Sequence, residues 1–301
     1  MTSVRLEEEA DRQLPSDDEI FLDHIAHFVA DPQSARAALA RAGFAPTPVS
    51  IQANPDPAGG VPKPSGTGNV TAMLTRGYIE VLFKTADTAL GRELEAARAR
   101  YGGLHLVAFA VANAHAAHRR LAKHFRMQPL LDMQRPLDTA EGPGIAAFTI
   151  ARLEHGQMPE GRIQILTHRT EETVWQKRWL DHPNGARALV SVTIAVADVE
   201  EAAARFSRFA GRASRPRDGG QVIALDRGRV ELITPNAFER AYPEIAIPSL
   251  PFVGACGIRV ASLAAAEKAL SRGGVDAYRR GDHLVVPFPS ELGTGTWIFA
   301  E

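Results

Sequence analysis

The stretch Leu22-Asp-His-Ile-Ala-His-Phe-Val-Ala-Asp31 determines how the rest of the chain folds. Its Ile, Phe and Val residues are typical of a buried strand, Asp31 is a favourable helix N-cap, and Pro32 suits the first turn of a helix. The same junction, each time before an Ala-rich segment, recurs at Val111-Ala112-Asn113, Val196-Ala197-Asp198 and Val260-Ala261-Ser262. Four strand-to-helix units in one chain indicate an internal repeat, which constrains the fold more than any single motif.

Length and composition limit the classes of protein to consider. The 301 residues can form two domains with separate cores. The formal net charge is −1 and no basic stretch is dense, so we expect no nucleic-acid partner. No apolar run approaches the roughly 18 residues that span a membrane, and the acidic residues 1–20 do not resemble a secretory signal. Cys256 is the only cysteine, which fits a cytoplasmic protein.

A second pattern marks the last strand of each unit. A glycine opens the strand, and the third residue after it points its side chain to one chosen face. The four copies are Gly77-Tyr-Ile-Glu80, Gly161-Arg-Ile-Gln164, Gly228-Arg-Val-Glu231 and Gly295-Thr-Trp-Ile298. Each unit therefore reads as strand, helix and three strands, and the sequence predicts four βαβββ modules.

We expect an α+β fold in which these modules pair into two curled mixed-sheet domains. The predicted division is an acidic tail over 1–20, an N-terminal domain over 21–170, a helix and linker over 171–186, and a degenerate C-terminal domain over 187–301. Within the N-terminal domain, the Pro- and Gly-rich segment 46–68 is expected to be a long loop, either a functional flap or an insertion.

The first and last strands of the N-terminal pair carry side chains that suit a metal ion. His24 and Glu80 occupy these strands in the first unit, and His105 and Gln164 occupy them, at a similar separation, in the second. If the two modules pair about a pseudo-twofold axis, all four side chains converge in a shared cup. Two imidazoles, a carboxylate and an amide oxygen suit Zn²⁺, Ni²⁺, Fe²⁺ or Mn²⁺, with positions open for a substrate oxygen.

Register raises a difficulty for one of these ligands. In the register of the repeat, the equivalent of His24 is Leu106, so His105 reaches the cup only if its strand carries a bulge or a shift.

Two further side chains, Asn69 and His168, are predicted to contact the substrate. The C-terminal pair cannot form a full metal site, because the four equivalent places hold Ser191, Glu231, Ala255 and Ile298.

The chain resembles the vicinal oxygen chelate superfamily, and within it the glyoxalase-like proteins, whose fold is shared by glyoxalases, bleomycin-resistance proteins and extradiol dioxygenases. The resemblance rests on Leu22-Asp-His24, Ser65-Gly-Thr-Gly-Asn69 and Gly77-Tyr-Ile-Glu-Val-Leu82. It implies paired modules around a cup with metal ligands on their first and last strands, a role that falls on His24 and Glu80. Gln164 departs from the carboxylate of the dioxygenases and is nearer to the glyoxalase pattern.

The favoured hypothesis is a divalent-metal-dependent lyase or isomerase that acts on a small oxygenated metabolite. His24, Glu80, His105 and Gln164 would hold the ion, and Glu80 would act as the catalytic group that moves a proton. The alternatives are a metal-free protein of the same fold that binds or sequesters a small molecule and, less favoured, an Fe²⁺ dioxygenase. A homodimer is left open, because four units in one chain can satisfy internally what shorter relatives satisfy by dimerising.

Overall fold

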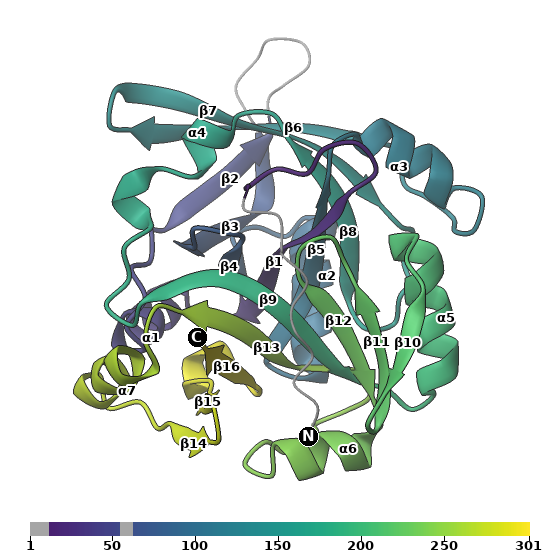
Figure 1. The fold of residues 1–301 in the computed structure, drawn as a ribbon. Coiled ribbons are helices and arrows are strands. Elements are labelled where there is room, and N and C mark those ends of the chain that lie inside the picture. The colour runs from purple at the N-terminus through teal and green to yellow at the C-terminus, as the bar shows by residue number, and fades with distance from the viewer. Residues whose placement is uncertain (1–11, 55–62) are drawn as a thin grey trace.

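The computed structural model describes residues 12–54 and 63–301, and Figure 1 shows a mixed α+β molecule built on a large curled sheet. The order of strand, helix and three strands occurs four times along the chain. The predicted fold class, four paired βαβββ modules, is therefore confirmed.

The N-terminal half contains two modules. The first comprises β1 (Ile20–Val29), α1 (Pro32–Arg41), β2 (Ser50–Asn54), β3 (Lys63–Met73) and β4 (Tyr78–Lys84). The second comprises β5 (Gly103–Val111), α3 (Ala114–Leu121), β6 (Leu131–Thr139), β7 (Gly142–Arg152) and β8 (Arg162–His168). Between these modules lies α2 (Ala89–Arg100), and after them come α4 (Glu171–Val174) and a 3-10 turn (Lys177–Trp179).

The C-terminal half repeats this order. The third module comprises β9 (Ala186–Ala195), α5 (Val199–Ala210), β10 (Ser214–Arg217), β11 (Gly220–Ala224) and β12 (Arg229–Ile233). The fourth comprises β13 (Phe252–Val260), α7 (Leu263–Arg272), β14 (Tyr278–Arg280), β15 (His283–Pro287), a 3-10 turn (Ser290–Leu292) and β16 (Thr296–Ala300). Helix α6 (Pro235–Ala241) lies between them.

The recurring junction works as the sequence predicts. The carboxylate of Asp31 accepts hydrogen bonds from the backbone N–H groups of Gln33 and Ser34 and caps α1. The residues that cap α3, α5 and α7 do the same for a backbone N–H three positions on: Asn113, Asp198 and Ser262. Each cap satisfies donors that the first helical turn leaves without partners, so the strand-to-helix turn forms in the same way four times.

Sheet pairing brings the first and last strands of paired modules together. Strand β1 is parallel to β4 and antiparallel to β5, which in turn is parallel to β8. In the C-terminal half, β9, β12, β13 and β16 pair in the same way. The halves meet in one sheet where Val253 on β13 pairs with Leu104 on β5.

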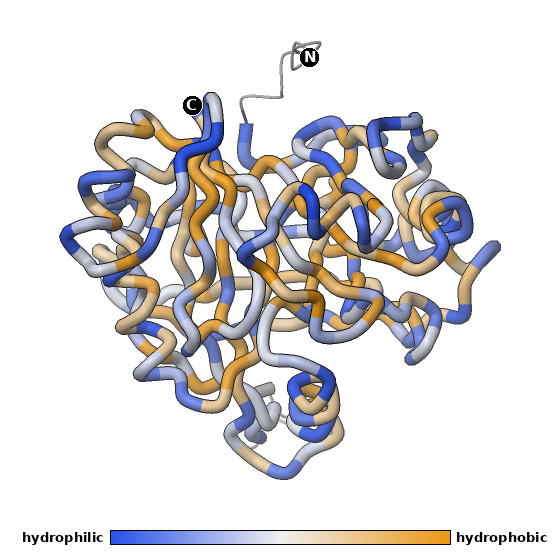
Figure 2. Tube along the Cα trace, turned by 90° about the horizontal axis from the view of Figure 1, so that it is seen from below, coloured by the Kyte–Doolittle hydropathy of each residue, from blue (hydrophilic) through white to orange (hydrophobic). Residues whose placement is uncertain are grey.

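Apolar packing and buried polar contacts hold the modules together. Figure 2 shows hydrophobic residues along the interior strands and hydrophilic ones along outer helices and loops.

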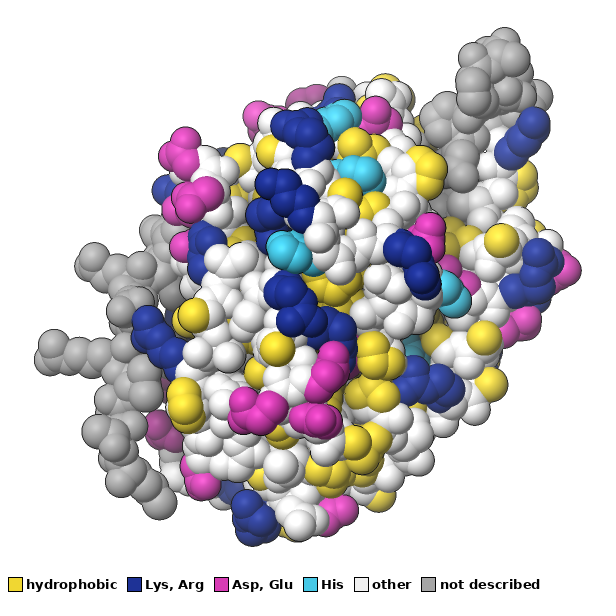
Figure 3. All heavy atoms as spheres, turned by 90° about the vertical axis from the view of Figure 1, so that its right-hand side faces the viewer, with side chains coloured by type: hydrophobic (Ala, Val, Ile, Leu, Met, Phe, Trp, Pro, Cys, Tyr) yellow, Lys and Arg dark blue, Asp and Glu magenta, His cyan; other side chains and the backbone are white. Residues whose placement is uncertain are grey.

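The face over α3 and α5 is charged. Figure 3 shows a column of Lys and Arg side chains there, and Arg120 on α3 donates to the carbonyls of Arg208 and Phe209. Arg205 forms a two-pronged ion pair with the buried carboxylate of Glu160, with N–O distances of 2.7 and 2.9 Å. This geometry compensates the desolvation of both charges.

The long loop expected over 46–68 is wrong in part. Strands β2 and β3 run through this segment and pair with each other, with Ser50 opposite Asn69, and residues 55–62 lie outside the described residues. Alternation in this segment is obscured by its Pro and Gly residues, so the pairing of β3 with β4 and of β2 with β3, rather than local pattern, determines the strands. Among the described residues, no helix is long and apolar enough to cross a bilayer.

Helix α6 was not anticipated, and it fills the cup of the C-terminal pair. The side chain of Phe238 is fully buried there among Ala195, Phe252 and Ala255. This apolar plug occupies the space that remains partly open in the N-terminal pair. Apolar side chains therefore pack around Phe238 in the described part of the C-terminal pair.

His27 on β1 belongs to the core. Its ring packs against the fourth module, where Nδ1–H donates to the carbonyl of Leu292 at 2.9 Å. Burial lowers the pKa of His27 to about 4, against the ordinary value of 6.5. The unfolded chain therefore binds more protons than the folded chain between pH 6.5 and pH 4.

We predict that the free energy of unfolding falls as the pH drops below 6.5, with His27 contributing up to about 1.4 kcal/mol per pH unit. Urea unfolding at pH 7, 6 and 5 measures this slope. The His27→Gln variant, in which the amide can still donate to Leu292, should show a shallower slope. The exposed His115→Gln variant should keep the original slope, and equal slopes in all three proteins would contradict the prediction.

Candidate functional site

A small chamber with a mixed polar and apolar wall lies inside the N-terminal pair, lined by residues of strands β1 to β8 and of helix α2. We call it the inner chamber; its volume is about 80 Å³. Three of the predicted site residues line it: His24, Glu80 and Gln164. Their first and last strands pair directly, with His24 opposite Tyr78 and Ala26 opposite Glu80. The structure therefore brings these three side chains together as expected.

The ring of His24 is held in one orientation. Its Nδ1 atom lies 2.7 Å from a carboxylate oxygen of Asp23, and its face stacks on the ring of Tyr78 at 4.3 Å. A carboxylate only accepts hydrogen bonds, so Nδ1 carries a proton and Nε2 is the ring nitrogen on the side of Glu80. Burial, together with the carboxylates of Asp23 and Glu80, raises the pKa of Tyr78 well above its ordinary range, so the stacked phenol stays neutral.

Asp23 is fully buried and joins two modules. Its carboxylate accepts from His24 on its own strand and from Nε2 of His168 on β8, at 3.0 Å. Burial raises the pKa of Asp23, but the charge and hydrogen bond of His168 and the hydrogen bond of His24 outweigh it and hold the pKa well below the ordinary range. A permanently ionised carboxylate therefore sits behind His24.

His168 was predicted to contact the substrate, but its position indicates another role. Its side chain is buried behind His24, packed between Phe148 at 5.1 Å and Trp175 at 4.6 Å, and it does not line the inner chamber. Strand alternation places His168 on the same face of β8 as Gln164. Its ring, however, donates to the buried carboxylate of Asp23 and is not part of the chamber wall. It orients Asp23 and does not reach a ligand directly.

Glu80 and Asn69 form a second fixed pair. The amide of Asn69 on β3 donates to Oε1 of Glu80 at 2.7 Å. The other oxygen, Oε2, lies 3.8 Å from Nε2 of His24. Asn69 therefore positions the carboxylate, and its side chain also lines a larger neighbouring cavity.

That neighbouring space, which we call the outer cavity, has a volume of about 520 Å³. It shares Tyr78, Arg135 and Phe148 with the inner chamber, so the two spaces adjoin at these side chains. Its other walls are mostly apolar and include Met73 and Trp179. A space of this size accommodates the body of a small molecule.

Gln164 lines the inner chamber, but its amide oxygen already accepts a hydrogen bond from another side chain. Its Oε1 atom accepts from Nε of Arg152, on the neighbouring strand β7, at 3.0 Å. A metal ion would have to compete with a guanidinium group for this oxygen. The amide therefore positions Arg152 in the chamber wall.

His105 does not reach the inner chamber. A bulge exists at the expected place, because Ala26 pairs with Leu106 and His27 with Leu104, which leaves His105 as the extra residue. The bulge turns the ring the other way: Nε2 donates to the carbonyl of Tyr101 at 2.7 Å, and Leu106 lines the chamber. The predicted convergence with His24 is therefore not seen.

The residues of this site that the sequence did not point to include Asp23, Tyr78, Arg135 and Arg152. Asp23 offered a signal, since a carboxylate within an apolar strand and next to a histidine has to find partners in the core. Tyr78 lies directly opposite His24 in the register of β1 and β4. The two arginines come from the hairpin β6–β7, whose mixed composition gave no pattern.

The donor set fits a divalent ion poorly. His24 Nε2 and Glu80 Oε2 are spaced as two ligands of one ion, which lie about 3–4 Å apart. Gln164 is held by Arg152, and Leu106 occupies the fourth place. The chamber wall carries three guanidinium groups, from Arg135, Arg152 and Arg162, against the single carboxylate of Glu80. Within residues 12–54 and 63–301, no three His, Cys, Asp or Glu side chains are clustered for a metal.

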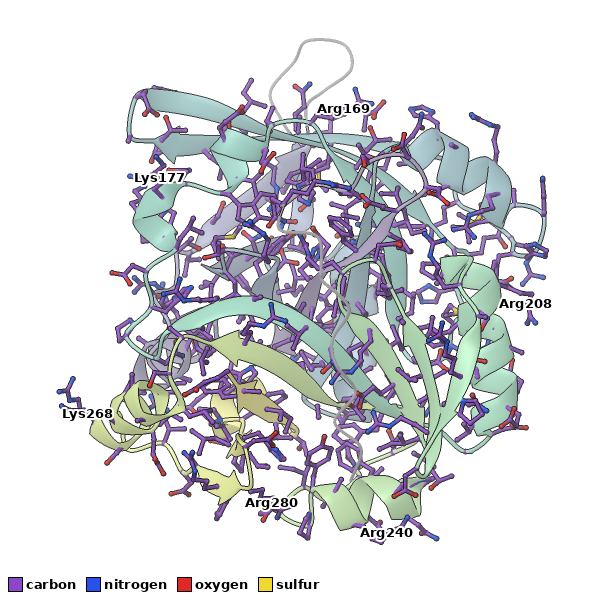
Figure 4. All side chains as sticks on the ribbon, in the orientation of Figure 1. Arg169, Lys177, Arg208, Arg240, Lys268 and Arg280 are labelled. Atoms are coloured by element: carbon purple, nitrogen blue, oxygen red, sulfur yellow. The ribbon has the colours of Figure 1, made fainter. Side chains whose placement is uncertain are left out.

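The distribution of charge distinguishes this chamber from the molecular surface. Figure 4 shows the labelled side chains at the outer edge of the molecule: Arg169, Lys177, Arg208, Arg240, Lys268 and Arg280. The guanidinium groups of the chamber instead line an enclosed space. Enclosed cations of this kind favour an anionic occupant.

Comparison with known families agrees with this geometry. Residues 22–210 match the family of glyoxalase-like domains. The chain belongs to this family. The match to this glyoxalase-like protein covers both N-terminal modules and continues through α5. No curated protein sequence matches the chain.

Solved structures share the fold of this glyoxalase-like protein. A hypothetical protein from Staphylococcus aureus superposes with a TM-score of 0.61 at 9% identity, covering 93% of this chain and 98% of that chain. A mutant of 4-hydroxymandelate synthase from Streptomyces coelicolor gives 0.57 at 14% identity, with 93% and 92% covered. A fusion of a xylose isomerase-like TIM barrel with 4-hydroxyphenylpyruvate dioxygenase gives 0.52 at 14% identity, with 96% and 50% covered. The vicinal oxygen chelate fold expected from the sequence is confirmed.

We predict that Asp23→Asn lowers the free energy of unfolding by about 2–4 kcal/mol, because a neutral amide replaces a charged acceptor that serves two buried imidazoles. Urea unfolding at pH 7 measures the change. The matched control is Asp87→Asn, at an exposed aspartate paired with Lys84 and Arg92, which should cost less than about 1 kcal/mol. Equal losses in both variants would contradict the role given to Asp23.

Proposed function

We propose that this glyoxalase-like protein is an enzyme, a lyase or isomerase that binds a small anionic, oxygenated metabolite in the inner chamber and moves a proton on it. The observation that supports this most directly is the position of the Nε2 atom of His24. It faces Glu80 Oε2 across 3.8 Å while Asp23 holds the other ring nitrogen. A histidine oriented in this way by a buried carboxylate is a suitable general base.

In the proposed reaction, His24 takes a proton from a carbon next to the substrate carbonyl. The C–H bond breaks, its electron pair moves onto the carbonyl oxygen to give an enolate, and the proton forms a new bond to Nε2. Asp23 stabilises the imidazolium that results. Glu80, whose other oxygen is held by Asn69, limits where the substrate can sit. Return of the proton to a different atom of the enolate completes an isomerisation.

Arg135 supports an anionic substrate. Its Nε atom is buried without a hydrogen-bond partner, and its guanidinium lies 5.5 Å from the ring of Phe148. No carboxylate among the described residues lies within ion-pair distance of it. A buried donor without an acceptor costs about 1–3 kcal/mol, which an anionic oxygen of a ligand would offset. Arg135 lines both the inner chamber and the outer cavity, where it can bind a carboxylate or an enolate oxygen.

We predict that the protein catalyses exchange of hydrogen for deuterium next to a carbonyl in at least one member of a panel of 2-oxo acids and 2-oxoaldehydes. Proton NMR in D₂O measures the rate. The His24→Gln variant should lose about 100-fold or more of this rate, because the base is removed. The exposed His115→Gln variant should retain it.

Two outcomes would contradict this proposal. One is a His24→Gln variant that is folded, by its unfolding transition, and exchanges at an unchanged rate. The other is ligand binding in the inner chamber without any exchange, which would favour the metal-free binding protein. Binding of the same panel is measured by calorimetry on the wild-type protein.

The metal-dependent alternative keeps one observation in its favour, since Asp23 orients His24 as carboxylates orient metal-binding histidines. Elemental mass spectrometry of the purified protein, before and after incubation with Zn²⁺, Ni²⁺, Mn²⁺ and anaerobic Fe²⁺, separates the two. We expect no stoichiometric metal and exchange that survives a chelator. One equivalent of metal, lost in both His24→Ala and Glu80→Ala, would instead establish the metal-dependent enzyme.

A further inference from the structure

A third space, which we call the back cavity, adjoins the inner chamber at two arginine side chains. Its volume is about 490 Å³, in the range of small-molecule sites. It is enclosed by helix α2, the segment 152–163 and, from the C-terminal half, Leu250 and Pro251. It shares only Arg152 and Arg162 with the inner chamber.

Three guanidinium groups line the back cavity, and their partners differ. Arg162 has a carboxylate partner, since its Nη2 lies 2.7 Å from an oxygen of Glu93. Arg100 donates only to the backbone carbonyls of Pro159 and Pro251, at 3.1 Å each. Arg152 donates through Nε to the neutral amide of Gln164. In the part of the chain that the structure describes, neither Arg100 nor Arg152 has a carboxylate within ion-pair distance.

The other acidic group of the cavity does not balance these charges. Glu154 pairs with Arg126, at 3.0 Å, on the outer side of the segment. The back cavity therefore contains two guanidinium charges without anionic partners, and Arg152 is only partly exposed. A partly buried, uncompensated cation destabilises the protein unless an anion accompanies it.

The titration behaviour of neighbouring groups agrees with a positive field. Burial, and then the charge of Arg162, lower the pKa of Arg152 to about 10. Burial also lowers the pKa of His105 to about 4, and the charge of Arg100 adds to this. Both groups therefore sense nearby cations, and for Arg152 the charges of Glu93 and Glu80 offset only part of the effect.

We propose that the back cavity is a separate binding site for a small molecule that carries a carboxylate or phosphate group, held by Arg152 and Arg100. The Nε atom of Arg152 is already used on the chamber side, and no described residue accepts from its Nη atoms, which leaves them for the anion. Phe28, Ala97 and Met158 provide apolar wall for the rest of the molecule. This site does not depend on the chemistry proposed for His24.

Calorimetry with inorganic phosphate and with succinate, at low ionic strength, tests this site on the full-length protein. Ala96 lies on the surface of α2 and lines the back cavity, so Ala96→Trp should block the cavity without disturbing the helix. The matched control is Ala99→Trp, an exposed position on the same helix that does not line the cavity.

We expect at least one probe to bind the wild-type protein and the Ala99→Trp variant, with affinity at least tenfold weaker in Ala96→Trp and in Arg152→Gln. Ala96→Trp distinguishes binding in the back cavity from binding in the inner chamber, because Arg152 borders both spaces and Ala96 borders only the back cavity. Failure of both probes to bind would overturn the proposal. Binding that is unchanged in Ala96→Trp would overturn it too, since the anion would then occupy another site.

Discussion

The buried carboxylate of Asp23 is the interaction on which the site depends. It accepts from His24 on β1 and from His168 on β8, so it joins the two modules that enclose the inner chamber. A charge this deeply buried is tolerated only because two imidazole donors satisfy it. The same bonds fix which nitrogen of His24 faces the chamber. The Asp23 carboxylate therefore both holds the two modules together and orients the histidine proposed to act in the cup.

Local patterns in the sequence predicted much of this arrangement, because the determinants are local. The caps at Asp31 and its equivalents need only the next three residues, and alternation along β4 places Glu80 on the chamber face. His105 could not be placed in this way. A bulge was only the condition for its reaching the cup; the bulge is present, but the direction of the ring depends on packing against Tyr101 and Phe28, which come together only in the folded chain.

The two halves show how one module pair supports another. In the C-terminal pair, Phe238 from α6 fills the cup, and the carboxylate of Glu231 is held by Arg229 at 2.7 Å and by Arg217. The N-terminal pair instead leaves space, with Arg135 and Arg152 lacking carboxylate partners. Both arginines come from the β6–β7 hairpin, whose mixed composition gave no signal for the positive charge of the site.

The tautomer of His24 is the most direct test of the central claim, that Asp23 orients this ring toward the chamber. Long-range ¹H–¹⁵N correlation spectra of protein labelled at histidine report which ring nitrogen carries the proton, and the His24→Gln variant assigns the signal. We expect the proton on Nδ1 at pH 7, with Nε2 unprotonated. A proton found only on Nε2 would show that Asp23 does not accept from His24, and the proposed general base would lose its basis.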